Sequence, residues 1–441
     1  MARRLALRPG NSATCKLIQV LCFCFLLTMT TMAGQAEQIT LTFMHWSGTS
    51  QQEGWDQLIA EFEAANPGIK VQQMPISSDY AGKIRIMLAS DSPPDIFMLD
   101  MQEVQYFGQN DLAIDLRPLA ESQPGFRFEE MNRYALEIMS YNGKLLGMPY
   151  GAGPNIYFFN ADMFDNAGIE YPSTQYKKGG WTWSDFRQAA MKLTHRDPDG
   201  KPQVIGAERG LHRIWMWTNG AAEFDNMMAP TKCLYDAPES VATFEFLQNL
   251  MHTDRVMAVS TADFGNQNNT SAFSNGAAAM IVRYDNGISD FGRVQHLRFG
   301  IAPYPKGPSS GGRYAADFAT SGYAIPKNAR HPEASWKFIA FISSREGQII
   351  VPGIKDTCLP TRSGALVYRV YPSNLVNPDL LMELTMLPNN GNRVRLLSPD
   401  QRDINSLIQL NPIWQNQQAP RTVLESITEI VNNYLREKSQ K

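Results

Sequence analysis

Residues 39–71 constrain the fold more than any other segment, because they carry the pattern of a strand, a loop, a helix and a second strand. Apolar residues alternate with threonine in 39–43, as in a half-buried strand, and Ser50 followed by Glu53 has the spacing of a capping box that starts a helix. The turn formers at 66–68 end that helix. The helix is expected to bury one apolar face, formed by Trp55, Leu58, Ile59 and Phe62.

Strands and helices continue to alternate beyond this unit. We expect a helix at 80–89 and a continuously apolar strand at 94–100, as in a sheet that is covered on both faces. The pattern predicts an α/β lobe. In parallel β-α-β units the ligand loop follows the first strand, so residues 45–49 are the first candidate for a binding loop.

An export leader precedes this unit. A basic stretch comes before the apolar run 17–27, and small residues just before Glu37 allow cleavage there. The apolar run is too short to cross about 30 Å of hydrocarbon at 1.5 Å per residue, which disfavours a retained transmembrane anchor. A lipid anchor is disfavoured because Cys22 and Cys24 each follow a large apolar residue. We therefore expect residues 1–36 to be a cleaved signal peptide and the mature protein to be periplasmic.

The charge, cysteine content and length of the mature chain narrow its class. Without the four basic residues of the leader, 36 Lys and Arg face 43 Asp and Glu, which disfavours nucleic acid and anionic membranes as partners. Cys233 and Cys358 either form one disulfide or stay free, because spacing alone does not show that their Cα atoms come within bonding distance. The mature length exceeds what one hydrophobic core usually supports, so two lobes are expected.

The rest of the chain suggests that it crosses between the lobes more than once. Strands at 144–150 and 155–160 flank the turn formers of 151–154, which we interpret as a crossover, and the Pro/Gly-rich stretch 305–312 is a second loop of this kind. Two late helices each carry a single apolar face. These faces consist of Trp336, Phe338, Ile339 and Ile342, and of Val423, Leu424, Ile427, Ile430, Val431 and Tyr434.

Several catalytic signatures are missing from the sequence. It contains no G-x-x-x-x-G-K-S/T run for ATP, no H-E-x-x-H or clustered Cys/His spacing for zinc, and no G-x-S-x-G elbow. We expect no enzymatic activity, no cofactor and no metal. A carboxylate pair for glycoside hydrolysis stays open, because its members meet only in three dimensions.

Aromatic residues supply the chemistry that the chain does have. Sugars stack their C–H faces on aromatic rings, and a cleft lined in this way binds without reacting. Most tryptophans lie on apolar helical faces or beside helix ends, where packing is their expected role. Trp46 follows a strand and Trp217 precedes a Thr-Asn-Gly turn, so for these two both packing and ligand contact stay open.

An ordered set of motifs resembles the extracellular solute-binding protein family 1 of ABC importers and covers essentially the whole mature chain. These motifs are Thr42–Trp46, Asn66–Val71, Tyr80–Lys83, Pro94–Ile96, Gly147–Tyr150, Tyr157–Asn160, Met163–Phe164, Ala167–Ile169, Gly322–Lys327 and His331–Phe338.

The resemblance implies a two-lobe α/β fold of the periplasmic binding protein type (type II), with hinge strands between the lobes and a ligand cleft between them. Lobe 1 would comprise residues 37–149 and 303–361, and lobe 2 residues 150–302 and 362–441. The protein is expected to be a monomer that delivers a small-molecule solute to permease subunits, with separate ATPase subunits supplying the energy.

The resemblance also implies a set of ligand-binding positions. Stacking would come from aromatic residues, hydrogen bonds from Asp100 and the backbone of the crossover, and a planar donor from a late loop that resembles the glycerol-phosphate branch of the family. A solvated loop remains the alternative for that late loop. The positions are Trp46, Ser47, Tyr80, Asp100, Gly151, Ala152, Tyr157, Trp217, Asn219, Tyr284, Asp285, Arg362 and Arg395.

Three functions follow as hypotheses. The first is capture of a mono- or oligosaccharide by lobe closure. The second is binding of a phosphorylated or charged solute such as glycerol 3-phosphate, suggested by Arg393 and Arg395. The third is a secreted carbohydrate-active enzyme.

Overall fold

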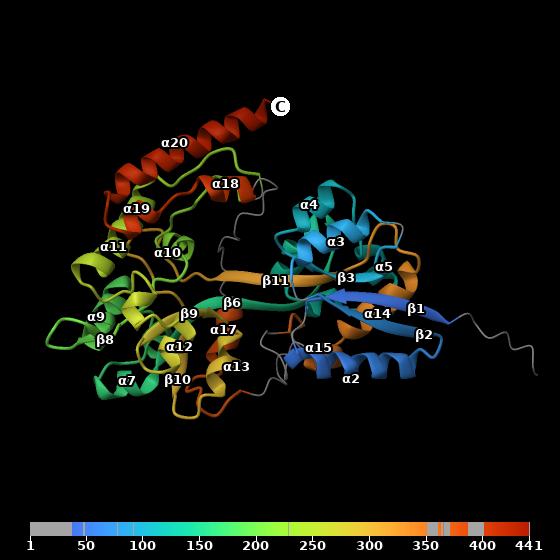
Figure 1. Cartoon of the computed structure of the whole chain (residues 1–441), viewed down its shortest axis with the longest axis horizontal. Helices are drawn as coiled ribbons and strands as arrows, with labels where there is room; N and C mark the ends of the chain where they lie inside the picture. The colour runs from blue at the N-terminus through green and yellow to red at the C-terminus, as the bar shows by residue number, and fades with distance from the viewer. Residues whose placement is uncertain are drawn as a thin grey trace, which may run out of the picture.

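The computed structural model describes residues 38–46, 49–76, 78–90, 92–227, 229–350, 360–362, 365, 371–386 and 401–440. These residues form two lobes that share two long strands, β6 (Met148–Asn160) and β11 (Asp317–Ala324) (Figure 1). The predicted leader, Ser47, Cys358 and Arg395 lie outside the described residues.

One mixed sheet runs through both lobes. Its strand order is β10-β6-β11-β3-β1-β2, and β9 also pairs with β6. β1 (Ile39–His45) lies between β2 (Ile69–Pro75) and β3 (Ile96–Asp100) and is parallel to both. β11 joins antiparallel to β3, and it is antiparallel to β6 as well. β9 (Met280–Tyr284) and β10 (Phe299–Ala302) extend the sheet on the other side, antiparallel to β6.

The first lobe is built around the predicted β-α-β unit. The predicted apolar face of the first helix is buried, with Trp55 at 0% and Phe62 at 1% exposed. That helix begins at Thr49, so Ser50 lies within its first turn instead of preceding it. The helices and short strands of this lobe are α2 (Thr49–Ala65), α3 (Tyr80–Leu88), α4 (Val104–Gln109), α5 (Arg117–Ser122), η1 (Phe128–Glu130), α6 (Arg133–Ile138), β4 (Ser140–Tyr141), β5 (Lys144–Leu145), α14 (Pro332–Ile342) and α15 (Arg345–Gln348).

The second lobe is mainly helical, as predicted for the stretch that ends near residue 257. Its apolar residues form two clusters, one on each side of the β6, β9 and β10 strands. The elements are α7 (Ala161–Asn166), α8 (Pro172–Lys177), α9 (Trp183–Leu193), β7 (His195–Arg196), β8 (Pro202–Val204), α10 (His212–Thr218), α11 (Pro238–Gln248), η2 (Asn249–Thr253), η3 (Thr261–Phe264), α12 (Asn269–Ser274), α13 (Gly287–Gly292), α17 (Leu380–Met386), α18 (Gln401–Leu407), α19 (Asn411–Trp414) and α20 (Pro420–Ser439).

The passage between the lobes differs from the predicted one. Residues 151–154 do not form a separate crossover, because they lie inside β6, which runs without interruption from one lobe into the other. Pro154 is tolerated there although it lacks a backbone N–H donor for the sheet. Tyr304 and Ala315 lie in the core of the second lobe, and the partly buried Tyr314 packs against that core. The chain therefore returns to the first lobe at the start of β11, later than residue 303.

The C-terminal helix α20 buries most of its predicted face. Val423, Leu424, Ile427 and Val431 are buried, whereas Ile430 is 45% exposed and was assigned to that face wrongly. Ile430 follows Ile427 by three residues, at the edge of the apolar stripe, where the helix turns toward solvent.

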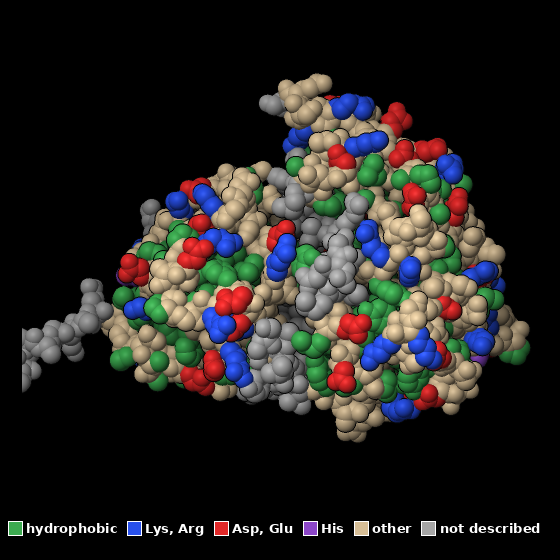
Figure 2. All heavy atoms as spheres, turned by 180° about the vertical axis from the view of Figure 1, so that it is seen from behind, with side chains coloured by type: hydrophobic (Ala, Val, Ile, Leu, Met, Phe, Trp, Pro, Cys, Tyr) green, Lys and Arg blue, Asp and Glu red, His purple; other side chains and the backbone are tan. Residues whose placement is uncertain are grey.

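Surface charge and helix length bear on the expected partners. On the face seen in Figure 2, acidic and basic side chains of the described residues are interspersed over both lobes, so this face carries no continuous basic stripe for nucleic acid. Within the described ranges, no helix has both the length and the apolar character needed to span a bilayer.

Candidate functional site

The edge of the first lobe that faces the second lobe is formed by the carboxyl ends of its parallel strands. Trp46 follows β1 and Asp100 ends β3, and because the two strands are parallel, both residues lie at the same edge. The Trp46 ring is half-buried and meets the ring of Tyr80 edge-on, with 4.8 Å between centroids. The structure therefore brings three of the predicted site residues to one edge of the sheet.

Tyr80 holds this edge together through its hydroxyl. The hydroxyl donates to the carbonyl of Met44 at 3.0 Å and accepts the N–H of Met98 at 2.9 Å, which links α3 to β1 and β3. Burial raises the pKa of this phenol well above its usual range, although the Met98 N–H opposes the shift. Both hydrogen-bonding functions of the hydroxyl are thus used by the backbone, so its ring, beside Trp46, is the part left for a ligand.

The two shared strands present one open face between the lobes. Along β11, Ala319 and Ser321 are partly exposed, whereas their neighbours Phe318 and Thr320 are buried, so solvent reaches only one side of the strand here. Directly opposite residues of antiparallel strands project to the same side. We call this side the shared-strand face; its residues are Asp100, Gly151, Gly153, Asn155, Tyr284, Asp317, Ala319 and Ser321.

The middle of the shared-strand face is made of small residues. Gly151 pairs with Ser321, and Gly153 pairs with Ala319. A side chain at Gly153 would collide with Asp285, since a Cβ built there lies 1.7 Å from the Asp285 Oδ1. Asp285 is 3% exposed and follows the end of β9, so its carboxylate folds over Gly153. Glycine at this position therefore makes room for a buried carboxylate on the predicted binding face.

An ion pair closes the second-lobe end of this face. Asp317 is fully buried, and its Oδ2 accepts hydrogen bonds from the Arg213 Nη2 at 2.6 Å and from the Tyr284 hydroxyl at 2.8 Å. Burial opposes the charge of Arg213, but the charge and hydrogen bond of Asp317, together with Glu223 and Tyr284, outweigh that effect and raise the pKa of the guanidinium. The Arg213 side chain remains 21% exposed. A charged pair and a phenol therefore meet where the chain leaves the second lobe.

Three other predicted residues lie in the core of the second lobe. Tyr157 and Trp217 are 1% and 0% exposed, and the Tyr157 hydroxyl donates to the carbonyl of Glu208. Asn219 is 1% exposed and uses its side chain to donate to the carbonyl of Glu239 and to accept from the N–H of Ser309. In this structure none of the three side chains reaches the shared-strand face, because each is enclosed by packing.

Arg362 belongs to the first lobe. It is 5% exposed, donates to Glu130 at 2.8 Å and to the carbonyl of Ser343 at 3.0 Å, and lies over the ring of Phe126. These contacts hold a loop and two helices together, which is a structural role.

The remaining predicted positions are Ala152, Ser47 and Arg395, together with the cysteines. Ala152 lies in β6, where its backbone pairs with Thr320 of β11. Ser47 and Arg395 lie outside the described residues, so their roles stay predictions. Cys233 is buried and forms no disulfide within the described residues; Cys358 lies outside them, so the disulfide that the sequence left open is not tested.

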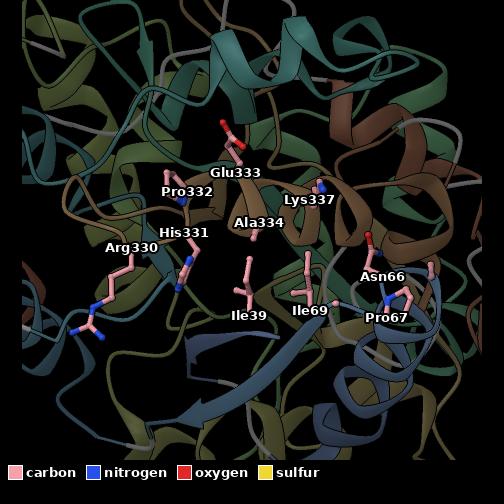
Figure 3. Close-up of a pocket in the computed structure, with 12 residues that line it drawn as sticks. Ile39, Asn66, Pro67, Ile69, Arg330, His331, Pro332, Glu333, Ala334 and Lys337 are labelled. Carbon is pink, nitrogen blue, oxygen red and sulfur yellow. The ribbon is translucent and has the colours of Figure 1, made fainter. Parts of the chain in front are cut away.

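A groove of about 710 Å³ lies elsewhere, on the first lobe (Figure 3). Ile39 and Ile69, the first residues of β1 and β2, line it together with the start of α14. Trp46 and Asp100 lie at the opposite, carboxyl ends of the parallel strands β1 and β3. The seven residues of β1 span about 20 Å. The groove is therefore separate from the shared-strand face.

Arg213 and Asp317 were not predicted from the sequence. Their side chains meet across 104 residues, and nothing in the local pattern of either segment marks a contact of that range. Arg213 lies in α10 next to an apolar stretch, and nothing in that local pattern indicates a role in binding.

Comparison with known proteins places the chain among binding proteins. A family model described as bacterial extracellular solute-binding protein matches residues 46–349. The arabinooligosaccharide-binding protein of Bacillus subtilis is 23% identical over 333 residues, which are 71% of this chain and 71% of that protein.

Solved structures share the fold. An ABC substrate-binding protein of Listeria monocytogenes in complex with cycloalternan superposes with a TM-score of 0.73 at 24% identity, covering 90% of this chain and 99% of that chain. UgpB from Mycobacterium tuberculosis in complex with glycerophosphocholine gives a TM-score of 0.72 at 19% identity, with coverage of 90% and 99%. At these identities the likeness concerns the fold, which is the predicted two-lobe α/β architecture.

Proposed function

The chain belongs to the bacterial extracellular solute-binding protein family, and we propose that it is the solute-capturing component of an ABC importer, with a carbohydrate as its solute. The observation that carries this proposal is the shared-strand face. Its first-lobe end carries the carboxylate of Asp100, and Trp46 lies beside that end at the same edge of the sheet; its other end carries an ion pair with a tyrosine. Rings that stack and polar groups that both donate and accept suit a polyhydroxylated solute.

The length of the face favours a solute of more than one sugar unit. Asp317 and Ser321, which lies opposite Asp100, are four residues apart on β11, or about 13 Å at the rise of a strand. A single pyranose ring is shorter than this span. A ligand that contacts both ends would join the lobes, and it would favour the closed form by its higher affinity for that form.

Delivery to a permease completes the proposed role. The predicted leader would place the protein in the periplasm, and the sequence has no P-loop, so separate ATPase subunits would drive transport. The permease would recognise the closed, loaded form.

A thermal-shift screen of the mature protein tests the solute class. The panel contains arabinotriose, maltotriose, mannotriose, cycloalternan and their monosaccharides, with glycerol 3-phosphate and glycerophosphocholine as charged members. A ligand at 100 times its dissociation constant adds about 2.7 kcal/mol of stability. A shift with neutral saccharides alone supports the proposal, and a shift with only the charged members contradicts it.

Substitution of Trp46 by Ala tests the site. We expect saccharide affinity measured by calorimetry to fall at least about tenfold, because a stacking face is lost. Trp336→Phe is the control, since Trp336 is 5% exposed in the core of the same lobe and donates to Gln123. Equal effects of the two substitutions on affinity would show that Trp46 acts through stability and not through contact.

The charged-solute hypothesis retains one specific observation in its favour, the structural likeness to UgpB with its glycerophosphocholine. If glycerol 3-phosphate or glycerophosphocholine binds, replacement of Arg395 by Ala should abolish that binding. Prolonged incubation of any bound saccharide, followed by chromatography, addresses the enzyme hypothesis, because product formation would contradict a role in binding alone.

A further inference from the structure

We infer that Arg213 and Asp317 select neutral over anionic solutes at the second-lobe end of the shared-strand face. This inference rests on the proposed function and names the residues that would set its specificity. Asp317 is fully buried, whereas Arg213 is 21% exposed, so the pair presents its guanidinium and not its carboxylate to solvent.

The guanidinium is only partly used by the protein. Its Nη2 donates to Asp317 at 2.6 Å, while its Nε is buried and has no hydrogen-bond partner among the described residues. An unpaired buried donor costs free energy unless some other group accepts from it. A solute hydroxyl oxygen that reached this nitrogen as the lobes close would satisfy the donor.

The position of the pair suits contact with a solute. Asp317 is the first residue of β11, and its register partner Asn155 is paired in turn with Tyr284, so the pair sits where the shared strands enter the second lobe. The Tyr284 hydroxyl donates to the same carboxylate oxygen as Arg213. Two donors fixed on one oxygen hold the guanidinium in a defined orientation, as is needed for a specific contact.

Charge balance decides which solute is accepted. The carboxylate of Asp317 already neutralises Arg213, and Glu223 and Asp285 add two further buried carboxylates on this side of the lobe, at 7% and 3% exposed. Glu223 acts electrostatically on Arg213 as well. Among the described residues, Asp317 and Glu223 thus act on Arg213 as two buried carboxylates, and Asp285 adds a third beside Tyr284. A phosphate ester would meet these carboxylates, whereas a neutral hydroxyl can accept from Arg213 and donate to a carboxylate.

The experiment changes the charge of the pair with little change in shape. Asp317→Asn leaves Arg213 without its counter-charge, and Arg213→Gln removes the exposed donor. Affinities of wild type and variants are measured by calorimetry for the tightest-binding neutral saccharide of the panel and, by competition, for glycerol 3-phosphate and glucose 6-phosphate. Arg187 and Asp254 form an ion pair with the same N–O distance, 2.6 Å, and neither residue lies on the shared strands. Asp254→Asn is therefore the control.

We expect both variants to lose at least about tenfold in affinity for the neutral saccharide, because each disturbs a hydrogen bond to a charged group. Asp317→Asn should also gain measurable affinity for a phosphorylated solute, and Asp254→Asn should match wild type. Circular dichroism melting establishes that each variant is folded. If Asp317→Asn does not fold, Arg213→Gln and Tyr284→Phe decide, and both must weaken saccharide binding.

The two proposals fail in different ways. Unchanged saccharide affinity in the variants, or a loss in Asp317→Asn without any gain for phosphorylated solutes, overturns the inference and leaves carbohydrate binding in place. Wild-type protein that binds the phosphorylated solutes and none of the neutral saccharides overturns the proposed function, and the inference with it.

Discussion

Replacement of Gly153 by Ala should strain the centre of the shared-strand face. A Cβ at this position would lie 1.7 Å from the Asp285 Oδ1 and 2.2 Å from its Cγ, whereas Cβ atoms in proteins essentially never come closer than 3.0 Å to another heavy atom. Asp285 is 3% exposed, so its short side chain has little room into which it can move. We expect a loss of about 1–3 kcal/mol in the free energy of unfolding, the usual cost of an added methyl in a packed site.

A double-mutant cycle identifies the cause. Urea unfolding is measured for wild type, Gly153→Ala, Asp285→Ala and the double variant, and the coupling between the two sites should be about 1 kcal/mol or more because the substitutions share one contact. Gly68→Ala is the matched control, since nothing lies within 4 Å of a Cβ at that position. It should be neutral or slightly stabilising, because alanine restricts the unfolded chain.

The same variants test the shared-strand face as a binding surface. In the Asp285→Ala background the clash is gone, yet the new methyl group still projects from the middle of the face. Saccharide affinity should therefore fall in the double variant relative to Asp285→Ala. Additive stabilities, within about 0.5 kcal/mol, would refute the steric reasoning, and unchanged affinity would refute contact between Gly153 and the solute.

Three further substitutions test the other contacts. Tyr80→Phe should cost about 1–3 kcal/mol in urea unfolding, because two buried backbone groups lose their partner, and a cost below about 0.5 kcal/mol would contradict that role. Arg362→Met should lower the free energy of unfolding by about 1–3 kcal/mol, which is less than the loss of a fully buried pair because Glu130 is 32% exposed. It should leave saccharide affinity unchanged. A loss of affinity would show that Arg362 belongs to the binding site. Burial, with two nearby arginines, lowers the pKa of His212 to about 3. The unfolded chain therefore takes up a proton below about pH 6.5 that the folded chain does not. The free energy of unfolding should fall as the pH drops from about 6.5 toward 3. His212→Gln should flatten this fall in urea midpoints between pH 7 and 4.5, and an unchanged slope would assign the acid sensitivity to other groups.

Local patterns predicted the first lobe well because its signals lie within short stretches. The alternation at the start of β1 and the apolar face of α2 each depend on residues a few positions apart, and both are found as predicted. The carboxyl ends of parallel strands lie at one edge of a sheet by geometry, so Trp46 and Asp100 lie at the same edge. The same reasoning misread residues 151–154, since turn-forming residues also occur inside a strand when its neighbours accommodate them.

Burial in the second lobe could not be read from the sequence. Trp217 and Tyr157 are residue types that often stack on sugars, but helices that are distant in sequence enclose both side chains. Arg362 had the same ambiguity, because an arginine near a crossing can hold a ligand or a neighbouring carboxylate. Only the packed structure distinguishes the two cases.

The sequence by itself determined the α/β class and the family resemblance, and it predicted export and a binding edge with Trp46, because these depend on local periodicity, composition and ordered motifs. The tertiary structure decided which side chains line the shared-strand face. Asp317, Arg213 and Tyr284 come from three segments far apart in the chain, and they meet through strand register and helix packing. Contacts of that range leave no periodic signal in the sequence, since each partner obeys only the pattern of its own element.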